Sequence, residues 1–455
     1  SSDVCSSDLS RFMKDQRWNF FPSFSLGWNV ARENFWKPLE SVVNQFKLRG
    51  SWGELGNQNT SNLYPFYEIL PVKSNSGNWL VNGGKTNTAD IPSLVSTLLT
   101  WERVRSFNVG FDFGAFSNRL TGSFDYFVRK TVDMVGPAPQ LPLVLGIAPA
   151  IVNNADMKSY GFEIELSWRD RIGEVDYGVK FNLADAQQKV VKYPNTTNAF
   201  SDWYAGKMSG EIWGYTSLGI AKTDEEMKEH LASLPNGGQN QLGNKWGAGD
   251  IMYADINGDG KVDGGKGTLA DPGDQRIIGN STPRYNFGLV LDASYKGFDV
   301  SIFFQGVGKR DYAPIVGTNG AVFWGAVNNI WQSMAMEEHF DYFRPEGHPM
   351  GANLNGYYPR PDFTSNKNHQ VQTRYLQDAS YIRLKNLQIG YTLPKQWINK
   401  LHINRCRVYV SGDNLWTGTS LASMFDPETL AAGDWGSGKT YPLSKVISFG
   451  LNVNF

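Results

Sequence analysis

Hydrophobic and polar residues alternate along the last nine positions of the chain. The apolar positions are Ile447, Phe449, Leu451, Val453 and Phe455, and the positions between them are Ser448, Gly450, Asn452 and Asn454. Side chains of a strand point alternately to opposite faces, so this segment predicts a strand with one apolar and one polar face. The pattern alone fits a soluble sheet or a membrane-spanning one.

The same alternation recurs along much of the chain and is rich in aromatic residues. Candidate strands cover residues 24–30, 46–52, 106–113, 120–129, 160–168, 177–183, 285–295, 298–304, 382–391 and 408–413. Several of them form consecutive pairs across short polar segments, which predicts antiparallel hairpins. We therefore predict an all-β fold, and the repetition favours an antiparallel transmembrane β-barrel.

Connections between these strands fall into two classes. Some are tight, such as Ser117–Arg119 and Lys296–Gly297, whereas residues of about 186–274 and 306–380 form long segments. Barrels of outer membranes have short turns at one rim and long extracellular loops at the other. Two short helices are expected inside the long loops, one at 223–234 after a capping box and one at 328–343.

Composition narrows the possible classes of protein. The 455 residues are 41% hydrophobic and 14% aromatic, and no stretch approaches the roughly 20 apolar residues of a membrane helix. Barrel strands need only every second residue to be apolar, so a membrane protein remains possible. Lys and Arg number 43 against 44 Asp and Glu, a balance that does not suggest binding of nucleic acid.

Aromatic residues crowd the predicted strand ends. They are Trp18, Trp28, Trp52, Trp101, Tyr126, Trp168, Tyr295 and Tyr391. Amphipathic rings favour the interface between membrane and water, although aromatic residues are also common in ordinary sheets. Together with the alternation, they favour a membrane.

One segment has the spacing of a calcium-binding loop. Its candidate ligands are Asp255, Asn257, Asp259, the carbonyl of Lys261 and Asp263, and Gly260 stands at the sharp-turn position. Ca²⁺ takes six to eight oxygen ligands, and these positions supply oxygens at the right intervals. Lys266 replaces the usual bidentate Glu, so Asp271 or Asp274 would have to complete the site. The alternative is a metal-free loop of Asx turns.

Catalytic motifs are weak. Residues 433–440 fit the letters of a phosphate-binding loop, but no strand precedes them and Pro442 follows, so we expect a flexible Gly-rich loop. Glu163 and Glu165 share a strand face and could mimic a hydrolase carboxylate pair, although a polar lumen explains them more simply. The five histidines show no ligand or triad spacing. We predict no enzymatic activity.

The first ten residues, SSDVCSSDLS, match neither a signal peptide nor the pattern that follows. We interpret residues 1–10 as a non-native leader and residues 11–455 as the barrel part. The true amino-terminal part of the protein is then expected to be missing.

Five segments together resemble the C-terminal barrel portion of SusC/RagA-type TonB-dependent outer-membrane transporters of Bacteroidota. They are FPSFSLGW (21–28), FKLRGSWGELGN (46–57), Trp101–Glu102 with FNVG (107–110), the block from Tyr253 to Asp263 with Gly273–Asp274 and IGNSTPRY (278–285), and SYIRLKNL (380–387). They occur in the family's order from about residue 17 to the end. Any one of them alone would be a weak signal.

The resemblance implies a barrel of about 22 strands, of which this chain would supply an incomplete C-terminal portion without the plug domain. It implies import of nutrients, glycans or oligosaccharides and in some cases peptides, across the cell outer membrane. The implied partners are a SusD-like lipoprotein, outer-membrane lipid and, through the missing part, TonB–ExbB–ExbD.

The sequence also assigns faces to the strands. We expect Phe107, Phe111, Ile164, Phe287 and Leu451 to face lipid, and Asn108, Asp112, Glu163, Glu165 and Asn452 to face the lumen. A secreted, calcium-dependent, glycan-binding β-protein is the main alternative, and it would instead bury one apolar face between sheets. A β-rich hydrolase is the third.

Overall fold

The computed structural model describes residues 2–8, 12–57, 66–92, 94–96, 99–136, 144, 146, 150, 152–314, 321–325, 336–362, 365–398, 403–430 and 440–454. Its chain divides into two compact units. The first holds residues 1–113, 123–162 and 186–209, and the second holds 114–122, 163–185 and 210–455.

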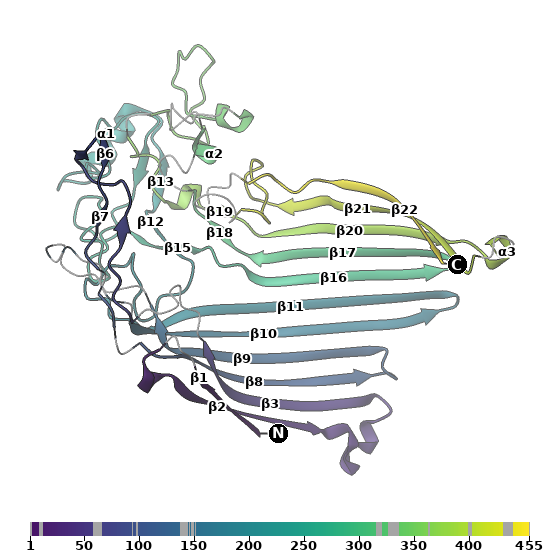
Figure 1. The fold of residues 1–455 in the computed structure, drawn as a ribbon. Coiled ribbons are helices and arrows are strands. Elements are labelled where there is room, and N and C mark those ends of the chain that lie inside the picture. Colours follow the sequence, from purple (N-terminus) through teal and green to yellow (C-terminus); the bar gives the residue numbers. More distant parts are fainter. Residues whose placement is uncertain are drawn as a thin grey trace. The chain divides into compact units, whose positions relative to one another are not determined.

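A 12-stranded sheet runs through the chain in the order β1-β2-β3-β8-β9-β10-β11-β16-β17-β20-β21-β22 (Figure 1). Its strands are β1 Ser2–Asp8, β2 Trp18–Asn29, β3 Val43–Asn57, β8 Glu102–Ala115, β9 Leu120–Val135, β10 Asn153–Ile172, β11 Val175–Lys192, β16 Arg284–Tyr295, β17 Phe298–Lys309, β20 Tyr381–Thr392, β21 Arg405–Thr419 and β22 Val446–Asn454. Sequence neighbours are sheet neighbours throughout, which is the up-and-down order of a barrel wall. The predicted all-β antiparallel fold is confirmed.

Tight turns connect the strands at one end. Between β16 and β17, Lys296 and Gly297 have φ angles of +45° and +89°. Positive φ at both central residues is the I′ geometry that matches the twist of a hairpin. Gly173, with a φ of +61°, and Glu174 form the two-residue connection between β10 and β11. These strands are longer than predicted, because polar residues near their ends continue the backbone hydrogen bonding with the neighbouring strand.

The remaining elements lie between the long strands. The short strands are β4 Val72–Lys73, β5 Leu80–Val81, β6 Gly84–Lys85, β7 Thr88–Ala89, β12 Glu211–Gly214, β13 Ser217–Ile220, β14 Ile251–Tyr253, β15 Arg276–Asn280, β18 Asp311–Tyr312 and β19 Gln377–Asp378. The helices are η1 Lys14–Gln16, η2 Val30–Arg32, η3 Asn34–Leu39, α1 Asp224–Ala232, α2 Ala321–Trp324, η7 Glu337–Phe340, η8 Thr373–Tyr375 and α3 Lys395–Ile398.

The helix predicted at 223–234 is confirmed as α1. Thr223 is its N-cap, and its hydroxyl accepts a hydrogen bond from the Glu226 backbone N–H at 3.1 Å. This satisfies one of the unpaired donors of the first turn. Of the helix predicted at 328–343, residues 328–335 lie outside the described residues, and the described part, 336–343, contains the 3-10 turn η7.

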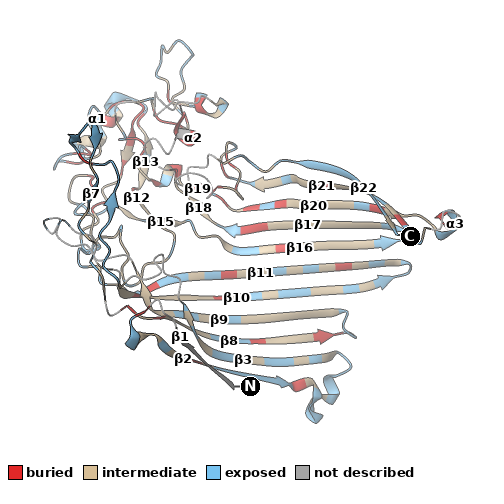
Figure 2. Ribbon diagram, viewed as in Figure 1, coloured by how far each residue is buried: buried red, intermediate tan, exposed pale blue. Residues whose placement is uncertain are grey.

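The larger hydrophobic core of the second unit lies in its loops and not in its strands. The core includes Tyr253, Phe323, Trp324, Tyr358 and Tyr375, each at most 2% exposed. Figure 2 shows buried residues concentrated among the loop elements, while the long strands are mostly intermediate or exposed. We call the part built from the described residues of 210–280, 311–380 and 420–430 the loop layer. Its packing gives the described parts of the long segments a defined fold.

Trp101 departs from the predicted aromatic girdle. It is 4% exposed and packs against Phe12, Phe21 and Leu99 in a small core of the first unit. Its indole N–H donates to the carbonyl of Arg17 at 2.9 Å. Trp101 is therefore a core residue and not part of a membrane-interface girdle. The segment before β8 folds back over the start of β2 and buries its ring.

Among the described residues, no helix is both long enough and apolar enough to cross a membrane.

Candidate functional site

One face of the sheet carries the apolar side chains. In the first unit, Phe24 lies opposite Trp52 and Trp28 lies opposite Leu48. In the second, one cross-strand row runs from Tyr295 through Phe298, Tyr391 and Val408 to Leu451. Within each unit these pairs share a face because directly opposite residues of antiparallel strands point the same way.

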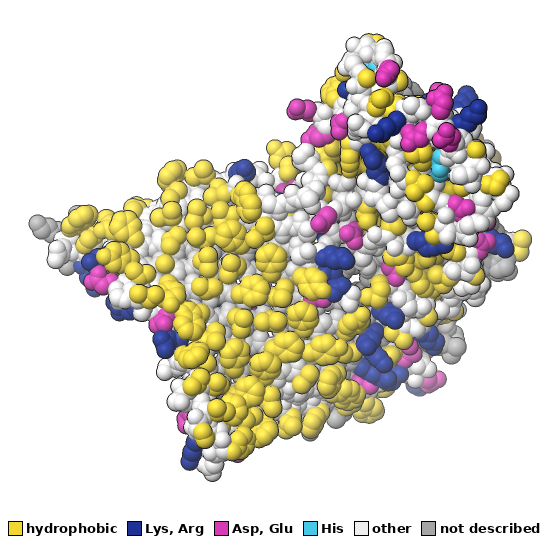
Figure 3. Space-filling view, turned by 180° about the vertical axis from the view of Figure 1, so that it is seen from behind, with side chains coloured by type: hydrophobic (Ala, Val, Ile, Leu, Met, Phe, Trp, Pro, Cys, Tyr) yellow, Lys and Arg dark blue, Asp and Glu magenta, His cyan; other side chains and the backbone are white. Residues whose placement is uncertain are grey.

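These apolar side chains are left open to the surroundings. Phe107 is 47% exposed and Leu451 is 65% exposed. Figure 3 shows the hydrophobic side chains of the strands filling one broad face. Exposed apolar surface of this extent marks contact with lipid or a partner. The predicted outward positions Phe107 and Leu451 are thus not sealed in an interior.

The opposite face is polar and bears ion pairs in the first unit. Arg49 of β3 donates to Asp112 of β8 at 2.8 Å and to Asp125 of β9 at 2.9 Å. The three side chains share the face predicted for Asn108 and Asp112, because they alternate with Leu48 and Phe111. One guanidinium thus joins three strands of the wall.

A second polar network lies on the corresponding face of the second unit. Arg407 forms an ion pair with Asp299 and donates to Gln388 at 2.9 Å. Asn452 lies directly opposite Arg407, and Asn386 donates to Asp413 at 2.7 Å. Four neighbouring strands, β17 and β20–β22, therefore present hydrogen-bonding side chains to one side.

The carboxylates considered for a hydrolase lie on β10. Glu163 and Glu165 are both exposed and alternate with Ile164, and neither lines the pocket of the second unit described next. The arrangement suits a polar wall.

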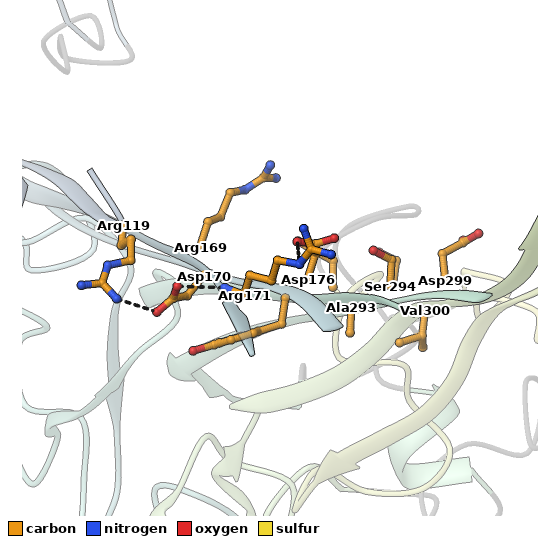
Figure 4. Close-up of a pocket in the computed structure, with 12 residues that line it drawn as sticks. Arg119, Arg169, Asp170, Arg171, Asp176, Ala293, Ser294, Asp299 and Val300 are labelled. Carbon is orange, nitrogen blue, oxygen red and sulfur yellow. Dashed lines mark hydrogen bonds and ion pairs between the residues drawn. The ribbon is translucent and has the colours of Figure 1, made fainter. Parts of the chain in front are cut away.

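A pocket of about 660 Å³ opens near the tight turns of β10, β11, β16 and β17. Its lining is Arg119, Arg169, Asp170, Arg171, Asp176, Tyr177, Asp292, Ala293, Ser294, Asp299, Val300 and Ser301. Figure 4 shows Arg119 joined to Asp170 and Arg171 joined to Asp176, at 3.0 and 3.6 Å. Mixed charges of this kind can receive a polar protein segment.

The two long loops are joined by a buried charge cluster. The Asp250 carboxylate receives hydrogen bonds from Lys367 at 2.9 Å, Asn368 at 2.9 Å and Arg360 at 2.6 and 2.7 Å. The Tyr253 hydroxyl donates to the carbonyl of Lys367 at 2.6 Å. Burial raises the pKa of Tyr253 well above its usual value, which keeps the hydroxyl protonated as a donor.

A third segment, residues 420–430, is anchored to strand β20. Arg383 of β20 donates to Asp426 at 2.8 Å and to Glu428 at 2.7 Å. Burial alone would raise the pKa of Asp426, but hydrogen bonds from Arg383 and from the backbone of Glu428 and Leu443 together lower it. Hydrogen-bonded charges therefore join two segments of the loop layer to each other and anchor the third to β20.

The calcium-type segment forms a tight turn. Asp255 accepts from the backbone N–H groups of Gly258 and Gly260 at 2.6 and 2.8 Å, and Asn257 accepts from Asp259 at 3.0 Å. Asp274 is fully buried and accepts from the backbone of Ile256 at 2.7 Å and of Asp263 at 2.8 Å. The candidate ligands are thus gathered by Asx-type hydrogen bonds.

A lysine lies within this turn. The Lys261 ammonium is hydrogen-bonded to Asp263 and lies 3.8 Å from Asp259. The hydrogen bond from Lys261 is the main reason why the pKa of Asp263 is lowered. Among the described residues, no group of three or more His, Cys, Asp or Glu side chains has the arrangement of a metal site. The donor types and spacing suit Ca²⁺, and Ca²⁺ binding here stays a proposal.

Sequence reasoning missed the residues that organise the loop layer. Asp250, Arg360 and Lys367 carry no motif, and neither does Gln239, whose buried side chain donates to the carbonyl of Ile251 at 2.8 Å. Arg360 and Lys367 lie more than a hundred residues from Asp250, and partners so far apart leave no periodic signal. Of the segment 433–440, which matches the residue pattern of a phosphate-binding loop, residues 433–439 lie outside the described residues.

Comparison with known proteins adds family evidence. The model of the family described as "TonB dependent receptor-like, beta-barrel" matches residues 6–415. The TonB-dependent receptor P3 of Formosa agariphila is 29% identical over 98% of this chain and 43% of its own length. SusC of Bacteroides thetaiotaomicron is 23% identical over 98% of this chain and 41% of its own.

A solved structure shares the fold. The structure of the RagAB peptide transporter aligns with a TM-score of 0.73 at 22% identity, over 98% of this chain and 44% of that one. The chain thus spans less than half the length of the curated relatives and of the solved structure that it matches.

Proposed function

Because the chain belongs to the TonB-dependent receptor β-barrel family of the outer membrane, we propose that it forms part of the wall of a nutrient importer. The observation that carries this proposal is the opposition of faces on the long strands. In the first unit Phe107 is exposed on one face and the Arg49 network lies on the other. In the second unit Leu451 is exposed on one face and the Arg407 network lies on the other. Lipid and an aqueous lumen are the two surroundings that such a wall separates.

The proposed cargo is a glycan or oligosaccharide, with a peptide as the second candidate. The likeness to SusC supports the first, and the likeness to the RagAB peptide transporter supports the second. Uptake of fluorescent oligosaccharides and peptides by cells that express or lack the full-length protein tests this choice. Accumulation of neither class would contradict import of either cargo.

The proposed partners are a SusD-like lipoprotein at the loop layer and TonB–ExbB–ExbD through the part of the protein outside this chain. The loop layer has its own core, so it offers a preformed surface. Leu218, Phe340 and Met350 are exposed large apolar residues on it, at 60%, 52% and 56%. Changing all three to Asp should abolish co-purification of the lipoprotein while leaving the barrel in the membrane.

The alternative function is that of a secreted, calcium-dependent, glycan-binding protein. It predicts a different location for the full-length protein. Fractionation of cells that produce the full-length protein should place it in the outer membrane, with migration on detergent gels that changes on heating. Free solubility without detergent would favour the secreted protein and would contradict the importer.

A further inference from the structure

Four basic side chains lie on the apolar face of neighbouring strands in the first unit. They are Arg105 on β8, Lys130 on β9, Lys158 on β10 and Lys189 on β11, and we call them the basic row. Arg105 is two residues from Phe107, and Lys130 is two residues from Val128. The Lys158 ammonium lies 5.2 Å from the centroid of the Tyr160 ring, which confirms that these two side chains share a face.

The four residues stand at matching heights along their strands. The rings of Phe111 on β8 and Phe124 on β9 stack with their centroids 5.6 Å apart, so these two residues lie side by side. Arg105 precedes Phe111 by the same number of residues by which Lys130 follows Phe124, which places Arg105 beside Lys130. The Asp133 backbone N–H donates to Asp156 at 3.0 Å, which brings the levels of Lys130 and Lys158 together.

The hairpin of β10 and β11 extends the row by one strand. Ile172 is the last residue of β10 and Val175 is the first residue of β11. Lys158 precedes Ile172 by the same number of residues by which Lys189 follows Val175, so the two lysines lie opposite each other in the hairpin. Opposite positions of an antiparallel pair share a face, so Lys189 continues the row of Lys158.

Acidic neighbours neutralise only one end of the basic row. Arg105 pairs with Glu54 at 2.7 Å, and the neighbouring Arg103 pairs with Asp133 at 2.9 Å. Within the described residues, no acidic side chain lies at ion-pair distance from the ammonium groups of Lys130, Lys158 and Lys189. Three adjacent positive charges on an apolar face need an anion or water, since an unpaired charge next to lipid is costly.

The basic row directly follows the apolar positions of β8, β9 and β10, whereas on β11 Asp185 and Gln187 stand between Leu183 and Lys189. On β10, apolar side chains follow Lys158 at every second position from Tyr160 to Trp168, a length of about 26 Å at 3.3 Å per residue. With a strand tilt of about 40° this spans roughly 20 Å, near the thickness of the apolar band of outer-membrane barrels. The row lies toward the long connections, and Figure 3 shows basic side chains at that border of the hydrophobic face.

We propose that the basic row binds phosphate groups on the headgroups of outer-leaflet lipid. Charge complementarity supports this occupant: ammonium groups at the polar edge of a lipid-facing surface meet phosphates at the level where headgroups lie. The inference rests on the proposed transmembrane placement of the strands. It adds a lipid site that the import function does not require.

The test uses the full-length protein purified in detergent, with bisphosphorylated lipid A and its dephosphorylated form as probes. Native mass spectrometry of lipid titrations should show a preference for the phosphorylated form. K130Q, K158Q and K189Q combined should reduce affinity for that form on the order of a hundredfold, at about one kcal/mol per lysine, and should leave the dephosphorylated form unaffected.

Matched controls separate the possible outcomes. Lys37, Lys228 and Lys395 are exposed lysines outside the long strands, and changing all three to Gln should preserve the preference. Equal loss in both triple variants, or displacement of lipid A by inorganic phosphate at millimolar concentration, would overturn the lipid site. Outer-membrane fractionation of the wild type and of both variants shows independently whether the proposed transmembrane placement holds.

Discussion

The ammonium group of Lys367 lies 2.9 Å from the carboxylate of Asp250, and neither side chain is more than 2% exposed. The two residues belong to different long loops, and each would leave a buried charge if its partner were removed. Such a pair does more for the relative position of two segments than for net stability, because desolvation offsets much of the attraction. The loops of this protein are therefore fixed with respect to one another.

Replacing Asp250 with Asn should destabilise the loop layer by about 3–5 kcal/mol, since the buried ammonium of Lys367 would lose its counter-charge. Limited proteolysis and hydrogen exchange of the full-length protein would detect this as earlier opening of residues 210–280. Glu229→Gln on the exposed side of α1 is the control and should change neither readout. Similar protection in all three proteins would show that the cluster does not hold the loops.

The two faces of β8 can be tested at adjacent positions. Phe111→Arg should cost roughly 2–4 kcal/mol if the side chain faces the middle of the bilayer. Asp112→Asn should cost at most about 1 kcal/mol, because the pair is half-exposed and Arg49 keeps Asp125. Refolding of the full-length protein into lipid vesicles with increasing urea measures both. Equal costs would contradict the assignment of lipid and lumen faces.

Stability of the loop layer should fall between neutral and mildly acidic pH. Burial lowers the pKa of His230 below its usual 6.5, although its hydrogen bond with Gln239 acts in the opposite direction. The folded state therefore binds this proton less readily than the unfolded state, so stability is complete above pH 6.5 and declines as pH falls toward the lower folded pKa. Hydrogen exchange of α1 at pH 7.5 and 5.5 should show the loss.

His230→Gln is the matched variant for this pH effect. A neutral amide cannot take up the proton, so the difference in exchange between the two pH values should shrink. An unchanged difference would assign the pH dependence to other groups.

Lys261 should compete with Ca²⁺ for the turn at 255–263, because its ammonium is bonded to Asp263. Lys261→Gln should therefore raise the affinity for Ca²⁺, and combined Asp255→Asn and Asp259→Asn should abolish binding. Isothermal titration of the full-length protein with CaCl₂ gives both results, with Asp202→Asn as a control outside the turn. No heat of binding in wild type and K261Q would favour the metal-free Asx turn.

Local patterns predicted the strands and their faces but not the loop layer. A period of two placed Phe107 and Asn108 on opposite sides, and the Lys296–Gly297 turn fixed the pairing of β16 with β17. Trp101 was misassigned because its partners, Phe12 and Phe21, approach only after the chain folds back. Asp250 and Lys367 could not be paired from sequence, because a buried ion pair between distant segments has no signature in either segment.

The larger core lies in the loop layer and not between the long strands. The two parts therefore depend on different surroundings to fold. The hairpins need a lipid bilayer to cover their apolar face. The aromatic cluster around Trp324 and Tyr375 buries its own side chains and can pack in water. The loop layer can then close independently of the surroundings that the long strands require. A substitution that opens its aromatic core should therefore leave the pairing of the long strands intact.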